Sequence, residues 1–548
     1  MFDDREPETA IFPGGAAGES PTRNMPGGPQ TGDHATAKPT AEYSFSSKKN
    51  LVFAAVAVAI LVAGGAFAYF YVVGRDRRID SIAVMPFANA SGNLELEYLS
   101  DGITESLINS LTRVPNISVK ARSSVFTYKG RDVTPQQVAK DLSVEAILNG
   151  RLVQHGDAVA LNLELIDAAT GNQLWGEQYN RKLSDLTALQ SEIARDVSAK
   201  LHTRLTGTDK QRVAKNYTEN AEAYQLYLKG KYHWNRRSRV DILKCIEYFQ
   251  QAAELDPNYA LAYSGLAEAY ILLPAYAGQD PQAAYTSART AAARALELDP
   301  ALSEAHAALG VILSEHDWNF AEAERSFRRA IDLNPNYPTA HHWYAEFLMA
   351  MGRSPEALTE IRRAQDLDPL SLIINGMHGV MLRLNGRYDE AFAQLKRTLE
   401  MDPNFVRTHI YLAETYQDVG RYEEAADEFH KVAEMNGAPA AQVEAARVRV
   451  IAAYRQEGPK GYFRAMAEHL EAVSKLRQAG NPPPATVVAA FWLQAGEKAK
   501  AYELLEAGLE RRDPEMLRLA DPKFDPIRGE ERFRKIVRQV GMPDRDAL

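Results

Sequence analysis

The histidine pair His341-His342, followed by Trp343, is the first place to look for chemistry in this chain of 548 residues. Two imidazoles can bind a transition metal, but neighbouring residues on a helix point about 100° apart and cannot share one ion without distortion. His306 and His316 have neither a carboxylate nor a cysteine partner at helical ligand spacing. We therefore expect no metal site and no cofactor.

The sequence also lacks the motifs that mark common catalytic centres. It contains no GxSxG elbow, HExxH helix, Walker A loop or paired-carboxylate motif. The single cysteine, Cys245, falls where a small residue is needed for two helices to cross, so we interpret it as a packing residue. The net charge of -9 argues against a nucleic-acid partner, which would require a strong basic stripe. We expect no catalytic residues and no enzyme.

With metal binding and catalysis set aside, the function that the sequence favours is binding of a partner protein by a polar surface. The repeat pattern described next predicts six side chains on one concave face: His342, Glu346, Arg383, Arg407, Glu414 and Gln417. Such a mixed-charge cleft would bind an extended or helical peptide segment of a partner protein. The alternative is an ordinary solvated face of charged residues.

A ladder of prolines positions these side chains. Each proline follows Asp or Asn and closes an alanine-rich apolar stretch, at intervals of 43, 35, 34 and 34 residues, and a further step of 34 reaches Gly437. The prolines are Pro257, Pro300, Pro335, Pro369 and Pro403. A period near 34 is typical of helix-turn-helix units that must stack into a solenoid, and it resembles the tetratricopeptide repeat (TPR).

Details within each unit fit that pattern. Alanines and glycines recur where helices cross, and each helix pair turns at a Gly-Arg step, where glycine can adopt the left-handed conformation. The steps are Gly352-Arg353, Gly386-Arg387 and Gly420-Arg421. The 43-residue interval predicts a longer loop around residues 273–281. We expect about eight helix pairs, with the repeats covering 220–437. Degenerate repeat-like helices should follow over 438–548 and end in a polar capping helix at 521–542.

Residues 79–207 have a mixed pattern of strands and helices. Apolar and polar residues alternate from Val159 to Ile166, as in a half-buried strand, and Thr134 is a helix N-cap. The expected elements are strand 81–87, helix 96–113, strand 117–121, helix 134–142, strands 146–153, 159–166 and 174–179, and helix 183–205. This order predicts a small α/β domain ahead of the solenoid.

Several stretches of this domain resemble the TolB amino-terminal-like domain, over roughly residues 80–205. They are IAVMPF, EYLSDGITESLINSL, ILNGRLVQHGD and LIDAATGNQLWGEQYNR. The resemblance implies a bacterial envelope protein, because that domain often lies just outside a membrane helix and ahead of TPRs. In that family a Ser/Thr kinase, winged-helix or cyclase domain usually lies on the cytoplasmic side. Only the tail 1–48 precedes the anchor here, so none of these activities is carried over.

A single membrane anchor is expected at Leu51–Val73. These 23 residues carry no charge, Lys48 and Lys49 precede them, and arginines follow. About 20 apolar residues span the hydrocarbon core of a bilayer. Gly64 and Ala68 form a small-xxx-small pair that would allow a homodimer through the anchor. Residues 1–48, rich in Gly, Pro, Ser and Thr, are predicted to be a disordered tail.

The expected molecule is thus mainly α: a TPR solenoid preceded by an α/β domain and one transmembrane helix. The basic residues on the two sides of the anchor balance, so orientation follows from the family resemblance, with the N-terminus cytoplasmic and the domains periplasmic. The function expected is an envelope scaffold that binds partner proteins. The alternative is the sensor half of a kinase or transcription-regulator system, with Thr9, Ser20 and Thr22 as candidate phosphoacceptors.

Overall fold

The computed structural model describes residues 56, 58–60, 62, 79–91, 96–114, 117–201, 215, 217–236, 238–476 and 484–543. The chain divides into two compact units, Met1–Asp76 and Arg77–Leu548, and the second contains the α/β domain and the repeats. The predicted tail 1–48, the pair Gly64 and Ala68, and most of the predicted anchor 51–73 lie outside the described residues. Within the described residues, no helix has the length and apolar character needed to span a bilayer.

The α/β domain has the predicted order of elements, with β2 and α3 added. Its mixed sheet has the strand order β3-β1-β4-β5-β6, in which β1 is parallel to β3 and β4, and β5 is antiparallel to both β4 and β6. The elements are β1 (Ser81–Val84), β2 (Ala88–Asn89), α2 (Glu97–Leu111), β3 (Ser118–Val119), α3 (Arg122–Phe126), α4 (Pro135–Leu142), β4 (Ala146–His155), β5 (Ala158–Asp167), β6 (Gln173–Lys182) and α5 (Leu186–Lys200).

The sequence patterns explain these elements. The alternating apolar residues of β5, Val159, Leu161, Leu163 and Leu165, are all buried on one face of the sheet. The Thr134 side chain accepts a hydrogen bond from the amide of Gln137 and begins α4, as an N-cap should. Helix α5 packs against both α2 and β6, so it closes the buried side of the sheet.

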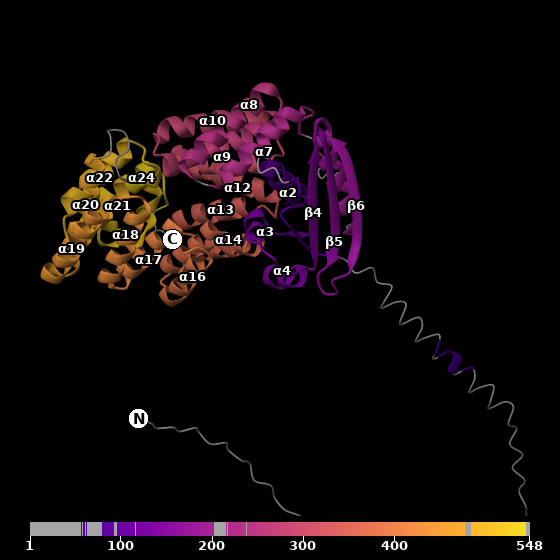
Figure 1. Cartoon of the computed structure of the whole chain (residues 1–548). Helices are drawn as coiled ribbons and strands as arrows, with labels where there is room; N and C mark the ends of the chain where they lie inside the picture. The colour runs from indigo at the N-terminus through magenta and orange to yellow at the C-terminus, as the bar shows by residue number, and fades with distance from the viewer. Residues whose placement is uncertain are drawn as a thin grey trace, which may run out of the picture. The chain divides into compact units, whose positions relative to one another are not determined.

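The repeats form eight consecutive helix pairs, as predicted. They are α7 (Ala221–Arg236) and α8 (Arg239–Leu255), α9 (Ala260–Ala277) and α10 (Pro281–Leu298), α11 (Ser303–Val311) and α12 (Phe320–Leu333), α13 (Pro338–Ala350) and α14 (Ser354–Leu367), α15 (Leu372–Leu384) and α16 (Tyr388–Met401), α17 (Val406–Asp418) and α18 (Tyr422–Met435), α19 (Ala440–Glu457) and α20 (Pro459–Leu476), and α21 (Ala485–Gln494) and α22 (Lys498–Glu510). Figure 1 shows them stacked side by side from α7 to α22.

The longer loop predicted around residues 273–281 is wrong. Helices α9 and α10 have 18 residues each, whereas α13 and α14 have 13 and 14, so the helices themselves absorb the extra nine residues. Pro274 lies inside α9, whose last turn ends at Gly278 with a φ of 66°. A proline near a helix end removes only one backbone hydrogen bond, so the helix can continue past it.

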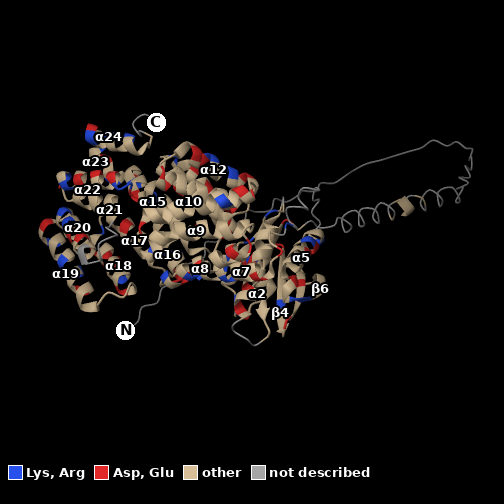
Figure 2. Ribbon diagram, turned by 90° about the horizontal axis from the view of Figure 1, so that it is seen from above, with Lys and Arg blue, Asp and Glu red and all other residues tan. Residues whose placement is uncertain are grey.

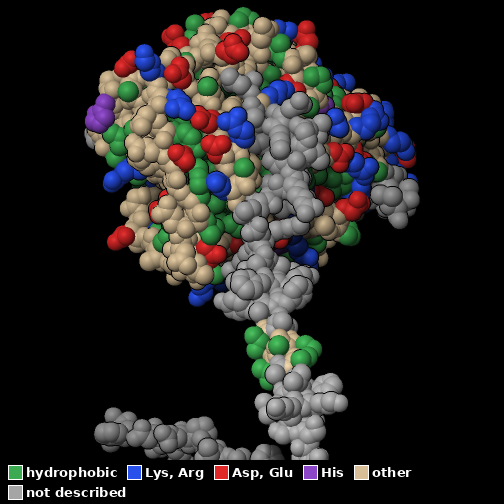
Figure 3. Space-filling model, turned by 90° about the vertical axis from the view of Figure 1, so that its right-hand side faces the viewer, with side chains coloured by type: hydrophobic (Ala, Val, Ile, Leu, Met, Phe, Trp, Pro, Cys, Tyr) green, Lys and Arg blue, Asp and Glu red, His purple; other side chains and the backbone are tan. Residues whose placement is uncertain are grey.

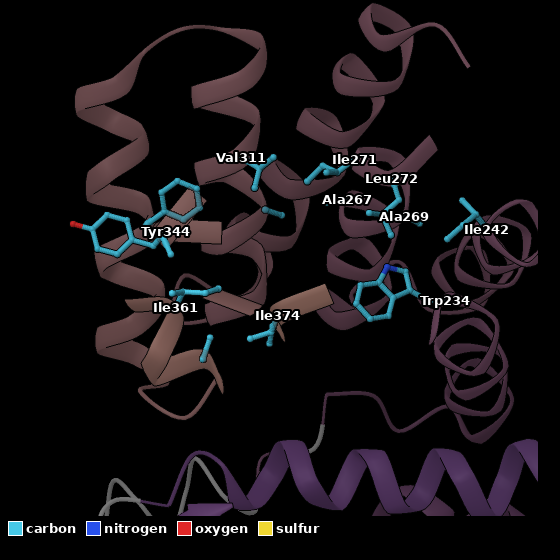
Figure 4. Packing of buried hydrophobic residues seen from close by; sticks show 14 of the residues in the cluster. Trp234, Ile242, Ala267, Ala269, Ile271, Leu272, Val311, Tyr344, Ile361 and Ile374 are labelled. Carbon is cyan, nitrogen blue, oxygen red and sulfur yellow. The ribbon is translucent and has the colours of Figure 1, made fainter. Parts of the chain in front are cut away.

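The predicted glycine turns are confirmed. Gly352, Gly386 and Gly420 have φ values of 77°, 72° and 78°, in the left-handed region that side chains with a Cβ disfavour. Between the turns, one cluster of buried apolar side chains continues from the α/β domain through the repeats to the last helix. Figure 4 shows part of it, where Tyr344, Ile361 and Ile374 come from three consecutive helices. Cys245 is fully buried, as its packing role predicts.

The proline ladder also holds the α/β domain. The carboxylate of Asp368 accepts hydrogen bonds from Ser123 and Ser124, the latter at 2.6 Å. The Asn336 amide donates to the carbonyl oxygens of Ile117, at 2.8 Å, and Thr112, at 3.2 Å. Residues at the ends of successive repeat helices therefore dock one edge of the α/β domain against the solenoid.

The C-terminus differs from the predicted single polar helix over 521–542. The chain instead forms η4 (Pro514–Ala520), η5 (Pro522–Phe524), α23 (Asp525–Arg528) and α24 (Glu531–Val540). Phe533, Ile536 and Val540 of α24 are buried, and Met542 lies near Ala350. The end of the chain thus returns to the middle of the solenoid, as Figure 1 shows.

Candidate partner-binding face

The first helices of the repeat pairs form the inner face of the solenoid, and other parts of the same chain cover it. Helix α2 packs on α7, and the side chain of Lys231 in α7 lies 3.6 Å from Glu105 of α2. Further along, η4 packs against α13. We call residues Pro514–Phe524, which comprise η4 and η5, the strap. The inner face therefore contacts α2 at its beginning and the strap further on.

All six residues predicted on the concave face lie in three of these inner helices. His342 and Glu346 come from α13, Arg383 from α15, and Arg407, Glu414 and Gln417 from α17. Five of them, His342, Glu346, Arg383, Arg407 and Glu414, reach the strap or a cavity beside it. These five residues thus share one surface, and in this structure that surface contacts the chain's own strap. Binding of a separate partner there stays a prediction.

Arg383 is the centre of the charged contacts. Its side chain is 2% exposed, and its guanidinium lies 2.6 Å from Asp418, 3.1 Å from Glu414 and 3.8 Å from Asp521 of the strap. Burial disfavours the charged form, but the three carboxylates outweigh it and raise the pKa of Arg383. The group is therefore a fixed cation to which both the solenoid and the strap contribute anions.

Glu414 connects the same cluster to the strap. Burial alone would raise the pKa of this carboxyl, but Arg383 and Arg518 overcome that effect and lower it to about 2. Arg518 of the strap lies 3.6 Å from Glu414, and Lys523 lies 3.9 Å from Asp418. The strap therefore presents a pattern of alternating charges that matches the inner face.

Arg407, His342 and Gln417 make other contacts as well. Arg407 lies over the ring of Tyr276 at 5.9 Å and lines the cavity beside the strap. His342 is buried, with Nε2 at 3.4 Å from Glu346. Gln417 donates to the hydroxyl of Tyr462, at 3.0 Å, so it joins α17 to α20 and does not line this cavity.

The histidines weighed as metal ligands make ordinary hydrogen bonds. His341 contacts Glu360 at 2.6 Å and the carbonyl oxygen of Pro335 at 3.0 Å. His316 contacts Asp317 and Gln282, each at 2.8 Å. In the part of the chain that the structure describes, no group of three or more His, Cys, Asp or Glu side chains is arranged to hold a metal ion.

The sequence analysis did not predict the strap or its contacts with the inner face. Three Asp-Pro steps, at Asp513, Asp521 and Asp525, were the available signal. The Asp513 and Asp521 side chains accept hydrogen bonds from the amides of Glu515 and Lys523, at 3.0 and 2.9 Å. Each step therefore begins a short capped turn and prevents one continuous helix.

Family comparisons support the two kinds of domain. The model described as "HilA/YgeH-like transcriptional regulator, second domain" matches residues 78–196. Tetratricopeptide repeat models match residues 319–373 and 382–449, and residues 348–405. The chain thus contains TPRs and a HilA-like α/β domain. The matching description is not that of the TolB domain, so the TolB resemblance stays a prediction.

Two curated relatives match about half of the chain. A protein named "Putative adenylate cyclase 3", from Rhizobium meliloti (strain 1021), is 33% identical over 286 residues, which cover 50% of this chain and 41% of that protein. "Transcriptional regulator HilA" of Salmonella typhimurium is 22% identical over 281 residues, 51% of this chain and 49% of that protein. The chain thus spans less than half the length of either relative.

Solved TPR structures resemble the chain only distantly. MamA is 20% identical, with a TM-score of 0.24, and the match covers 28% of this chain and 90% of MamA. The human IFIT1 dimer is 14% identical, with a TM-score of 0.40 over 59% of this chain and 77% of that one.

Proposed function

We propose that the chain is a membrane-anchored scaffold whose inner TPR face binds a segment of a partner protein in exchange for its own strap. The observation that carries this proposal is the charged contact between the inner face and residues Pro514–Phe524. A surface that pairs Arg383 with Asp521 and Glu414 with Arg518 has the features needed to bind a short peptide with the same charges. The repeats already hold these side chains in place, so little ordering entropy opposes binding.

A labelled synthetic peptide of residues 511–526 tests the proposal. It should bind weakly to the full chain, because the tethered strap competes at a high effective concentration. It should bind more tightly to a variant with Arg518→Ala and Asp521→Ala, whose own strap has lost its charges. Fluorescence anisotropy measures both affinities. A peptide of scrambled sequence is the control, and equal binding of the two peptides to the variant would contradict the proposal.

We further propose that Leu51–Val73 anchors the chain in a membrane, with the N-terminus in the cytoplasm and the folded domains in the periplasm. Gly64 and Ala68 would allow two anchors to pack as a homodimer. The uncharged run of 23 residues supports the anchor. Alkaline carbonate washing of membranes should leave the full chain in the pellet, and an alkaline phosphatase fusion after residue 548 should be active. Release of the intact chain by carbonate would contradict the anchor, and an inactive fusion would contradict the orientation.

The sensor half of a signalling system is the second candidate. The relatives described as a cyclase and a transcriptional regulator favour it, because both names belong to signalling proteins. On this hypothesis the tail is a phosphoacceptor, at Thr9, Ser20 or Thr22. Incubating the full chain with candidate kinases and radiolabelled ATP distinguishes the two ideas, since the scaffold predicts no incorporation into the tail. In neither case do we propose a reaction catalysed by this chain.

A further inference from the structure

Two adjoining cavities lie between the inner face and the strap. They have volumes of about 610 Å³ and 250 Å³ and share walls from η3 (Ile312–His316), α13, α17 and the strap. The larger one also reaches α9 and α10. Volumes of about 300–1,000 Å³ are typical of sites that hold small organic ligands.

Carboxylates dominate the polar walls. Five acidic side chains line the larger cavity against three arginines: Asp280, Glu315, Glu346, Asp513 and Glu515, with Arg407, Arg511 and Arg512. Each of these arginines already has a partner, and the partners Tyr276 and Asp513 line the same cavity. Arg407 lies over Tyr276, Arg512 lies over Trp318, and Arg511 is 4.0 Å from Asp513.

Two of these carboxylates lack a strong cationic partner. Glu315 accepts a hydrogen bond from the Tyr285 hydroxyl, and Glu346 has only His342 Nε2 nearby, at 3.4 Å. Among the described residues, no lysine or arginine forms an ion pair with either carboxylate. His342 itself is 6% exposed, lines the larger cavity, and its Nε2 atom has no hydrogen-bond partner within the described part of the chain. His342 and Glu346 thus present polar atoms to the cavity that the described side chains leave without a close hydrogen bond.

The backbone that positions Glu315 is unusual. Residues Ile312–His316 form a π-helix at the end of α11, and Trp318, two residues later, has a φ of 56°. Single π-helical turns are rare and occur frequently at functional sites. Here the turn places Glu315 on the wall that both cavities share.

We propose that these cavities bind a small organic cation, with an ammonium or guanidinium group between Glu315 and Glu346 and a flat apolar body against Trp343 and Tyr411. The carboxylates supply charge-assisted hydrogen bonds, and aromatic rings attract cations through their faces. Trp343 and Tyr411 line the larger cavity beside these carboxylates.

The site should respond to pH. Burial raises the pKa of Glu315 to about 8, and the nearby Glu346 and Glu515 act in the same direction against the Tyr285 hydrogen bond. The charged or titratable groups that line the two cavities with Glu315 include Tyr285 from α10, His342 and Glu346 from α13, Arg383 from α15, Arg407 from α17, and Glu515 and Arg518 from the strap. A bound cation favours the ionised carboxylate, so binding should release a proton. The affinity should therefore rise by up to about tenfold per pH unit as the pH approaches 8.

Calorimetry on the full chain in detergent tests the proposal. The probes are tryptamine and phenethylamine, and indole-3-propionate is the anionic control with the same ring as tryptamine. We expect at least one amine to bind with a dissociation constant below about 1 mM, more tightly at pH 8 than at pH 6, and the anion not to bind. Glu346→Gln should weaken binding by about tenfold or more, as should Glu315→Gln. Glu356→Gln, on the exposed surface of α14, should leave the affinity unchanged.

Circular dichroism shows whether each variant has folded before its affinity is compared. Failure of both amines to bind the folded wild-type chain would overturn the proposal. Equal binding of the anion would do the same, as would unchanged affinity in both Glu315→Gln and Glu346→Gln.

Discussion

At the scale of single residues, Arg383 makes the central ion pairs between the inner face and the strap. Its guanidinium is buried among carboxylates that would repel one another without it. Buried ion pairs stabilise a fold only modestly in net terms, but removal of one partner leaves uncompensated charge in the interior. Arg383 therefore holds Glu414, Asp418 and the strap together, and its removal should destabilise the fold by more than the net contribution of the ion pairs.

Arg383→Ala should lower the free energy of unfolding by about 3–5 kcal/mol. Urea titration followed by circular dichroism measures the change. Arg387→Ala is the matched control, because Arg387 lies four residues further along and pairs with Glu390 at the surface. If the two substitutions shift the urea midpoint equally, the central role of Arg383 is wrong.

The contribution of Glu315 to folding stability should change with pH in the opposite direction from that of a salt-bridged acid. Burial raises its pKa from 4.5 to about 8 in the folded chain, so the unfolded chain loses this proton first. Wild-type stability from this group therefore falls as the pH rises through that window. Glu315→Gln has no such proton, and its melting temperature relative to wild type should increase from about pH 5 to about pH 8.

Glu356→Gln provides the comparison for that series. The hydrogen bond from Arg353 lowers the pKa of Glu356, so this carboxyl is ionised throughout the same range. The difference in melting temperature between Glu356→Gln and the wild type should therefore stay constant between about pH 5 and pH 8. A constant difference for Glu315→Gln as well would show that Glu315 is not held neutral by burial.

At the scale of elements, the proline ladder has two roles. Each Asp/Asn-Pro step ends a repeat helix, and the steps near residues 334 and 368 also bind the α/β domain. Asn336→Ala would leave the carbonyl oxygens of Thr112 and Ile117 without this donor and should cost about 1–3 kcal/mol. Asn404 occupies the same position one step beyond the domain, is exposed, and should tolerate alanine.

Thermal unfolding of both variants tests this docking contact. A lower melting temperature for Asn336→Ala but not for Asn404→Ala would support it. In hydrogen exchange, the faster exchange of Asn336→Ala should be confined to the α/β domain and the neighbouring repeats. Equal effects in Asn336→Ala and Asn404→Ala would mean that the residue serves only the repeat turn.

The local elements could be predicted from the sequence because their signals are local. A period of 34 residues, the Gly-Arg turns and the alternation in β5 each depend on neighbouring residues. The longer loop at 273–281 was a wrong prediction, because an insertion of nine residues can lengthen two packed helices as easily as a loop. Sequence spacing alone does not distinguish these outcomes.

The candidate site was only half predictable for a similar reason. Repeat alignment places Glu346, Arg383, Arg407 and Glu414 on one face, since equivalent positions in stacked units share a surface. Their partners Arg518, Asp521 and Lys523 lie more than 100 residues away in sequence. Contacts of that kind depend on how the chain returns over its own solenoid, which no local pattern specifies.

At the scale of the whole molecule, the α/β domain contacts the inner face at α7, and the strap contacts it at α13, α15 and α17. Basic and acidic side chains are intermingled over α19–α24 in Figure 2 and on the face of the molecule in Figure 3. We therefore do not expect long-range electrostatic attraction of one sign of charge to guide partners to this surface. Access to the inner face depends instead on displacement of the strap.

Hydrogen–deuterium exchange on the full chain tests that claim most directly. The amides of residues 514–524 should be protected in the wild type, together with those of α15 and α17. Arg518→Glu combined with Asp521→Arg should reverse the charges of the strap, speed exchange in residues 514–524 and expose the inner helices at the same time. If residues 514–524 of the wild type exchange as fast as an unstructured peptide, the strap does not cover the inner face and our account is wrong.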